Sequence, residues 1–220
     1  MNDFQAILFD GDGTLIDTED IILASMRHTI NELHGMGATD EALMAGVGTP
    51  LPDQMMAFAK GDQALADQLV REYRAHNDSI HDAVIHAFPD TREALELLRE
   101  AGFRMGVVTS KRHEMAARGL ELSGIAEFFE VLVAPDDYPE HKPAPGPILY
   151  ACQLMDVDPT ASMYVGDSPF DIQAGNAAGC TTVAALWGMF PPDVLAAEHP
   201  DRECASLMEL ARWLTNNPSA

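Results

Sequence analysis

Two aspartates separated by one residue, Asp10 and Asp12, follow a short apolar run near the start of the chain. The run, Ala6 to Phe9, predicts a buried strand. Alternate residues of an extended strand share a side, so both carboxylates could face one pocket. Two such charges 4 Å apart repel by about 1 kcal/mol in water and about 4 kcal/mol at an effective dielectric near 20. A divalent cation such as Mg²⁺, or a shared proton, would offset this repulsion. The alternative is a polar turn without chemistry, since Asp and Gly favour turns.

Polar residues also follow two later apolar runs. Together with Asp10 and Asp12, they would lie at one edge of a sheet. Further strands are predicted at 103–108, 130–134, 162–165 and 181–186, with helical segments between them. Strands that alternate with helices indicate a parallel sheet covered on both faces. Ligands bind such sheets outside the carboxyl ends of the strands. Thr109 and Asp167 follow the second and fourth predicted strands, so we expect both near Asp10 and Asp12.

A long segment after the first strand has a different character. Residues 16–84 contain no run that predicts a strand, but helices are expected from Asp17 or Thr18 to about His34 and over 62–84. We therefore predict a discontinuous α/β core, residues 1–15 and 85–220, with a helical domain of residues 16–84 inserted after the first strand. Capping boxes are expected at Asp90 and Ser206, before helices of the core.

Composition limits the classes of partner. The net charge of −22 argues against binding of nucleic acids or anionic membranes. No run approaches the roughly 18 apolar residues of a membrane span, and no signal peptide is evident. Three widely spaced cysteines favour neither a disulfide framework nor a zinc site. We expect a cytoplasmic protein, as a monomer or weak homodimer.

Four motifs, in order, resemble those of the haloacid dehalogenase-like (HAD) phosphohydrolase superfamily. They are Asp10-Gly11-Asp12-Gly13-Thr14, the run ending in Thr109, Lys142-Pro143, and Gly166-Asp167-Ser168-Pro169-Phe170-Asp171. The resemblance implies a Rossmann-like core, a helical cap inserted after the first strand, and Mg²⁺ as cofactor. It covers residues 10–171, and the helical insert corresponds to the cap.

The chemistry of these residues agrees with the roles that the resemblance implies. Asp10 would attack phosphorus and form an aspartyl-phosphate, and Asp12 would act as general acid and then general base. Thr109 and Lys142 would bind the phosphoryl oxygens. Lys142 could alternatively be a solvated loop residue, and the other nearby cation, Lys111, is expected to point away. The expected metal site comprises Asp10, Asp12 through its backbone carbonyl, Asp167, and Asp171 in a supporting position.

Beside Thr109 and Lys142, further substrate contacts are expected from the cap and from Ser110 of the core. Arg74, Asn77 and His81 would share one face of the helix over 62–84, although a solvated face is the alternative. Ser110 is a further candidate for substrate binding, or a cap of the next helix. The stretch from Tyr73 to Asp82 is similar to the cap of the phosphoglycolate phosphatase and PpaX-type pyrophosphatase branch, which implies phosphoglycolate or pyrophosphate as the substrate.

Two other functions remain open from sequence. A sugar phosphomutase of this superfamily would carry a histidine where Ile22 stands, which disfavours that activity. A non-catalytic module that keeps a phosphate or metal site is the third possibility, and the intact Asp12 argues against it.

Overall fold

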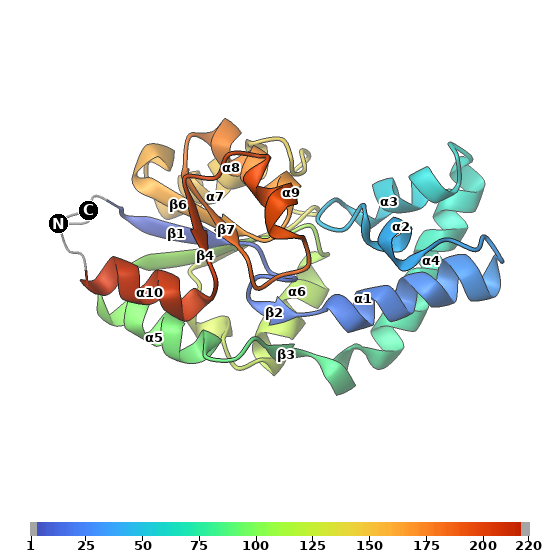
Figure 1. Ribbon diagram of the computed structural model, residues 1–220, viewed down its shortest axis with the longest axis horizontal. Helices are drawn as coiled ribbons and strands as arrows, with labels where there is room; N and C mark the ends of the chain where they lie inside the picture. Colours follow the sequence, from blue (N-terminus) through green and yellow to red (C-terminus); the bar gives the residue numbers. More distant parts are fainter. Residues whose placement is uncertain (1–3, 217–220) are drawn as a thin grey trace.

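A computed structural model describes residues 4–216, whose core is a six-stranded parallel sheet in the order β5-β4-β1-β6-β7-β8 (Figure 1). The strands are β1 (Ala6–Phe9), β4 (Arg104–Val108), β5 (Val131–Val133), β6 (Ser162–Gly166), β7 (Thr181–Ala185) and β8 (Arg202–Cys204). The apolar runs predicted the first five of these strands. They did not predict β8, because Arg-Glu-Cys offers no apolar run.

Helices cover both faces of the sheet. One face packs against α5 (Thr91–Glu100), α6 (His113–Leu122) and α10 (Leu207–Asn216), and the other against α7 (Gly146–Met155) and α8 (Pro169–Ala178). The short α9 (Pro192–Ala196) lies beside α8, as Figure 1 shows. The strand period of two separates the faces: Ile7 and Phe9 of β1 join the first cluster, and Ala6 and Leu8 join the second.

The helices of the insert form a separate unit beside the sheet (Figure 1). They are α1 (Glu19–Met26), a π-helical continuation (Arg27–Leu33), α2 (Asp40–Met44), α3 (Leu51–Phe58) and the long α4 (Gln63–Val84). Their apolar faces bury a cluster of their own, which includes Met26, Ile30, Met55 and Leu69. The described helices include none that is long and apolar enough to cross a membrane.

A pair of very short strands joins the insert to the core. β2 (Ile16–Asp17) and β3 (His86–Ala87) pair antiparallel, with Ile16 opposite Ala87. The expectation that residues 16–84 contain no strand is therefore wrong at its first two positions. Two residues are too few to produce a sequence period, which is why the strand gave no signal.

The two predicted capping boxes differ in outcome. Asp90 has a positive φ of 60° and its side chain makes no capping hydrogen bond, so the box expected there does not form, although α5 still begins at Thr91. At the last helix, Ser206 Oγ accepts a hydrogen bond of 3.1 Å from the Glu209 amide, as expected. The Glu209 carboxylate accepts from the Ala205 amide. The three cysteines are free thiols.

Candidate active site

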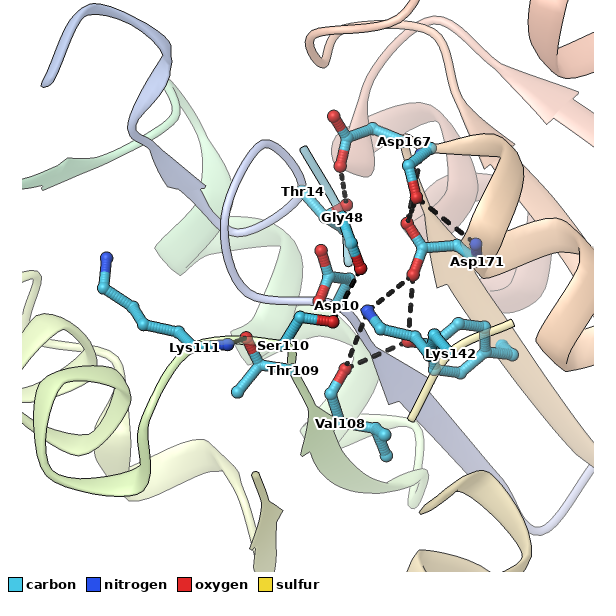
Figure 2. A network of polar contacts seen from close by, with 12 residues as sticks. Asp10, Thr14, Gly48, Val108, Thr109, Ser110, Lys111, Lys142, Asp167 and Asp171 are labelled. Carbon is cyan, nitrogen blue, oxygen red and sulfur yellow. Dashed lines mark hydrogen bonds and ion pairs between the residues drawn. The ribbon is translucent and has the colours of Figure 1, made fainter. Parts of the chain in front are cut away.

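Three neighbouring strands bring the predicted catalytic residues to one edge. β4, β1 and β6 lie side by side, and Thr109, Asp10 and Asp167 each follow the last residue of one of them. All three line the same cavity, and Figure 2 shows them around the end of β1. All three are nearly inaccessible to solvent, between 2% and 6% exposed. The edge predicted from strand periodicity is therefore the edge at which these groups meet.

A buried ion-pair network surrounds Asp10. Lys142 Nζ lies 2.7 Å from Asp10 Oδ1 and 2.7 Å from Asp171 Oδ1, and it is 3.4 Å from the Val108 carbonyl oxygen (Figure 2). Tyr164 donates a hydrogen bond to the Val108 carbonyl at 3.0 Å, and its hydroxyl lies 3.2 Å from Asp171 Oδ1. Lys142 is therefore a buried partner of Asp10 and not a solvated loop lysine.

The charged groups of this network shift one another's pKa values. Burial raises the pKa of Asp10 to about 7, and the adjacent Lys142 offsets only part of that effect. Burial acts to lower the pKa of the Lys142 ammonium, but the carboxylates of Asp10 and Asp171 outweigh it and raise that pKa well above its usual value. Lys142 is thus held cationic at the point where phosphoryl charge would develop.

Three carboxylates form a compact acidic cluster. Oxygens of Asp10, Asp167 and Asp171 lie within 4.8 Å of one another, and all three residues are buried. Burial raises the pKa of Asp167 well above its usual value, and the charges of Asp171 and Asp10 add to this effect. A cation among these oxygens would relieve the repulsion, and an all-oxygen donor set suits Mg²⁺. The residues present therefore fit the ion that the family implies.

The position of Asp167 is fixed from several sides. Its Oδ1 accepts a hydrogen bond of 3.0 Å from the Thr14 hydroxyl, and its Oδ2 accepts one of 2.8 Å from the Met189 amide. Gly13 passes so close that a Cβ there would lie 2.3 Å from Asp167 Oδ2. Glycine at position 13 therefore makes room for the carboxylate.

Asp171 is occupied by other partners. Its Oδ1 faces Lys142 and Tyr164, and its Oδ2 accepts from the Ser168 hydroxyl at 2.6 Å and the Ser168 amide at 3.0 Å. Ser168 and Asp171 thereby form a capping box at the start of α8. The sequence suggested that Asp171 supports the metal or its waters, whereas in the structure its carboxylate contacts Lys142, Tyr164 and Ser168.

Asp12 faces away from this cluster and toward a second lysine. Lys111 Nζ lies 3.0 Å from Asp12 Oδ1, and both residues line the cavity described below. The Lys111 side chain extends away from Lys142 in Figure 2, but its ammonium contacts Asp12 at the wall of the cavity. The expectation that it points away is wrong in this respect, because the Asp12 carboxylate draws its ammonium back.

One cavity of about 400 Å³ lies between the core and the insert. Asp10, Asp12, Thr109 and Asp167 line its core side, and Ile22 lines it from the insert. Residues from 47–54, part of α4 and Phe190 complete the wall. The residues predicted to perform chemistry thus open on a space large enough for a small phosphorylated ligand.

The three polar residues predicted on one face of α4 separate in the structure. Arg74 and Asn77 line the cavity, and Asn77 Nδ2 donates to Ser25 Oγ at 3.2 Å. His81 does not line it: the side chain is fully buried, with Nδ1 3.2 Å from Asp82 Oδ1. The expectation that His81 contacts substrate disagrees with this position. A spacing of seven residues carries it one turn too far along the helix, to the packing surface with α6, where Gly119 lies beside it.

Ser110 connects the core to the insert. Its hydroxyl donates a hydrogen bond of 2.6 Å to the Gly48 carbonyl, and both residues line the cavity (Figure 2). The residue at the N-cap of α6 is Arg112, so Ser110 does not cap that helix. The loop that contains Gly48 is therefore held against the catalytic edge.

Sequence reasoning missed three residues of the site. Arg112 and Asp78 line the cavity, and Tyr164 completes the Lys142 network. Arg112 follows Lys111 directly, so its place in a strand-end loop was available as a signal. Tyr164 could also have been identified from the sequence, since a tyrosine within a buried strand needs a partner for its hydroxyl.

The family model described as haloacid dehalogenase-like hydrolase matches residues 7–185. This chain belongs to that family. It is 36% identical to a protein named pyrophosphatase PpaX of Oceanobacillus iheyensis, over 90% of each chain. It is also 36% identical to the pyrophosphatase PpaX of Anoxybacillus flavithermus, again over 90% of each. The prediction of a HAD-family enzyme is therefore confirmed.

Solved structures show the same fold. A haloacid dehalogenase-like family protein of Streptococcus pneumoniae superimposes with a TM-score of 0.84 at 24% identity, covering 97% of this chain and 100% of its own. A protein of Haemophilus somnus, described as a predicted phosphoglycolate phosphatase, gives a TM-score of 0.86 at 24% identity, covering 97% and 99%. The predicted α/β core with its helical insert is confirmed at the level of fold.

Proposed function

We propose that this HAD-family enzyme is a Mg²⁺-dependent phosphohydrolase that acts through an aspartyl-phosphate on a small anionic phosphate. The observation that carries the proposal is the position of Asp10. Its carboxylate lies at the end of β1, beside the buried ammonium of Lys142, and opens on the cavity. A carboxylate held next to a fixed cation can attack phosphorus while the charge of the phosphoryl group is compensated.

The other residues divide the remaining tasks. Asp12 lines the same cavity, where it would protonate the leaving oxygen and then take a proton from the attacking water. One residue can do both in turn because the first step leaves it ionised. Thr109 would donate a hydrogen bond from its hydroxyl to a phosphoryl oxygen. Ser110, which lines the cavity beside it, would become a further donor if its hydroxyl left the Gly48 carbonyl.

The carboxylates of Asp10 and Asp167 and the backbone carbonyl of Asp12 would hold the metal ion. When bound, Mg²⁺ neutralises phosphoryl charge and aligns phosphorus with the nucleophile. Thr14 and the Met189 amide fix Asp167, and Asp171 holds Lys142. These contacts keep the ligands and the cation in place before substrate arrives.

Pyrophosphate and phosphoglycolate are the substrates that the comparisons suggest. Curated relatives are named pyrophosphatases, and residues 16–84 would close over the site as a cap. Arg74 and Asn77 are the cap side chains that we propose for substrate contact, because both line the cavity. Phosphomutase activity is disfavoured, since Ile22 lines the cavity where a mutase would carry a histidine.

The test is hydrolysis of p-nitrophenyl phosphate, pyrophosphate and phosphoglycolate with Mg²⁺, by the wild type and Asp10→Asn. We expect Asp10→Asn to lose at least about a thousandfold in kcat. Rapid quenching of the wild type should give the mass of one added phosphoryl group on the peptide that contains Asp10. Asp136→Asn, which changes another carboxylate of the cavity wall outside the acidic cluster, is the matched control. Full activity of Asp10→Asn would refute the assignment of the nucleophile.

A further inference from the structure

Two arginines face the cavity from opposite sides. Arg74 belongs to α4 of the insert, and Arg112 precedes α6 of the core. Both line the space that contains Asp10. The whole chain carries only 13 lysines and arginines against 35 acidic residues. Two guanidinium groups in one small cavity therefore mark a site for anions in an otherwise acidic protein.

Arg112 has an internal counter-ion. Its Nη2 lies 3.2 and 3.3 Å from the two carboxylate oxygens of Asp78, which also lines the cavity. The Arg112 and Asp78 side chains are 36% and 45% exposed. Ion pairs this accessible to water contribute little to stability. An anionic ligand can therefore displace the Asp78 carboxylate from Arg112 at low cost.

Arg74 lacks such a partner at one position. Its Nε is buried and has no hydrogen-bond acceptor among the residues that the structure describes. Burial lowers the pKa of the Arg74 guanidinium, repulsion by Arg112 lowers it further, and Asp78 opposes them. A buried donor without an acceptor is costly, and a ligand that supplies the acceptor recovers that cost.

We propose that a second anionic group of the substrate, phosphoryl or carboxylate, binds between Arg74 and Arg112 and displaces Asp78 from Arg112. The inference rests on the proposed function, because the first phosphoryl group is taken to sit at Asp10. A ligand with one anionic group leaves the Arg112–Asp78 pair intact, so Arg112 adds nothing to its affinity. Arg112 and Asp78 are therefore specificity-determining residues that favour substrates with two anionic groups.

The position of the two arginines adds a second effect. Because Arg74 lies on the insert and Arg112 on the core, one ligand group held by both joins the two parts of the protein. The carboxylate of Asp78 joins them in the same way when no ligand is bound. When the anionic group of the ligand replaces the Asp78 carboxylate at Arg112, the insert stays attached to the core. The same exchange opens the position between Arg74 and Arg112.

Calorimetric titration tests this without any turnover. The ligands are methylenediphosphonate, phosphonoacetate and phenylphosphonate in the presence of Mg²⁺. Beside one phosphonate, the first carries a second phosphonate, the second a carboxylate and the third no further anionic group. We expect Arg112→Gln to weaken binding of at least one of the first two by about tenfold or more. The same substitution should change the affinity for phenylphosphonate by less than about twofold. Asp78→Asn, which frees Arg112, should strengthen binding of the same ligand.

The matched control is Arg118→Gln. Arg118 also pairs across α6 and α4, with Asp82, but it does not line the cavity. An equal loss in Arg118→Gln, or an equal loss for all three ligands in Arg112→Gln, would overturn the proposal. Weaker binding by Asp78→Asn would do so as well. Because binding is measured, these outcomes are separate from a failure of the proposed hydrolysis, which would appear as absent turnover with intact ligand binding.

Discussion

Lys142 Nζ donates a hydrogen bond of 2.7 Å to Asp10 Oδ1 across 132 residues of chain. The lysine lies in the loop before α7, and the aspartate follows β1. Both side chains are nearly inaccessible to solvent, so each charge has the other as its close partner. The proposed nucleophile is therefore held by a group that reaches it only in the folded protein.

Removal of that ammonium should destabilise the protein strongly. Lys142→Met leaves Asp10 and Asp171 buried without their cation, which we expect to lower the free energy of unfolding by about 3–5 kcal/mol. Urea denaturation without Mg²⁺ measures the loss. Lys111→Gln removes a more accessible pair and should cost about 1 kcal/mol or less. Equal losses in the two variants would contradict the difference in burial.

Asp167→Asn should weaken metal binding more than it changes the fold. The substitution removes one of the two carboxylates proposed as ligands, and even partners outside the ligand shell are worth about tenfold in metal affinity. We expect the Mg²⁺ concentration for half-maximal activity to rise by about tenfold or more. The increase in Tm on addition of Mg²⁺ should shrink in parallel. A variant that needs no more Mg²⁺ than the wild type would exclude Asp167 as a ligand.

Gly48→Ala should disturb the contact between insert and core. The glycine has a positive φ of 99°, and a Cβ there would lie 2.7 Å from Ser168 Oγ. We expect a severalfold increase in KM, because the loop whose Gly48 carbonyl accepts the Ser110 hydrogen bond must move away.

Gly61→Ala is the matched control for this change. Gly61 also has a positive φ, of 88°, but a Cβ there meets nothing within 4 Å. Both variants carry the backbone strain of about 1–2 kcal/mol. Only Gly48→Ala should alter KM. A similar increase in KM in both variants would show that backbone strain, and not the contact at Gly48, causes the effect.

The core motifs were predictable because each combines an apolar run with a polar residue at its end. That reasoning located Asp10, Thr109 and Asp167, and the resemblance added Lys142. The Arg112–Asp78 pair could not be predicted in the same way, since its partners lie on different elements 34 residues apart. Nothing in the sequence says which face of α4 meets α6. The same uncertainty placed His81 with Arg74, although packing puts it outside the cavity.

His81 provides a pH dependence of stability. Its side chain is fully buried, and burial lowers the pKa of its imidazole below the ordinary value near 6.5. The unfolded chain therefore binds a proton that the folded chain resists, and stability falls as the pH drops below about 6.5. Urea titrations between pH 7 and pH 5 should show a shallower loss for His81→Gln than for the wild type. The exposed His86→Gln should follow the wild type, and a similar flattening there would contradict the role of burial.

The antiparallel pair β2–β3 places the two ends of the connection to the insert next to each other, with Ile16 opposite Ala87. The chain therefore leaves the core and re-enters it at neighbouring positions, however many residues lie between them. We therefore expect the six parallel strands, with the ends that carry Asp10, Thr109 and Asp167, to tolerate changes in the length of the inserted segment. New substrate preferences can thus evolve by exchange of one module, while the phosphoryl chemistry is inherited unchanged.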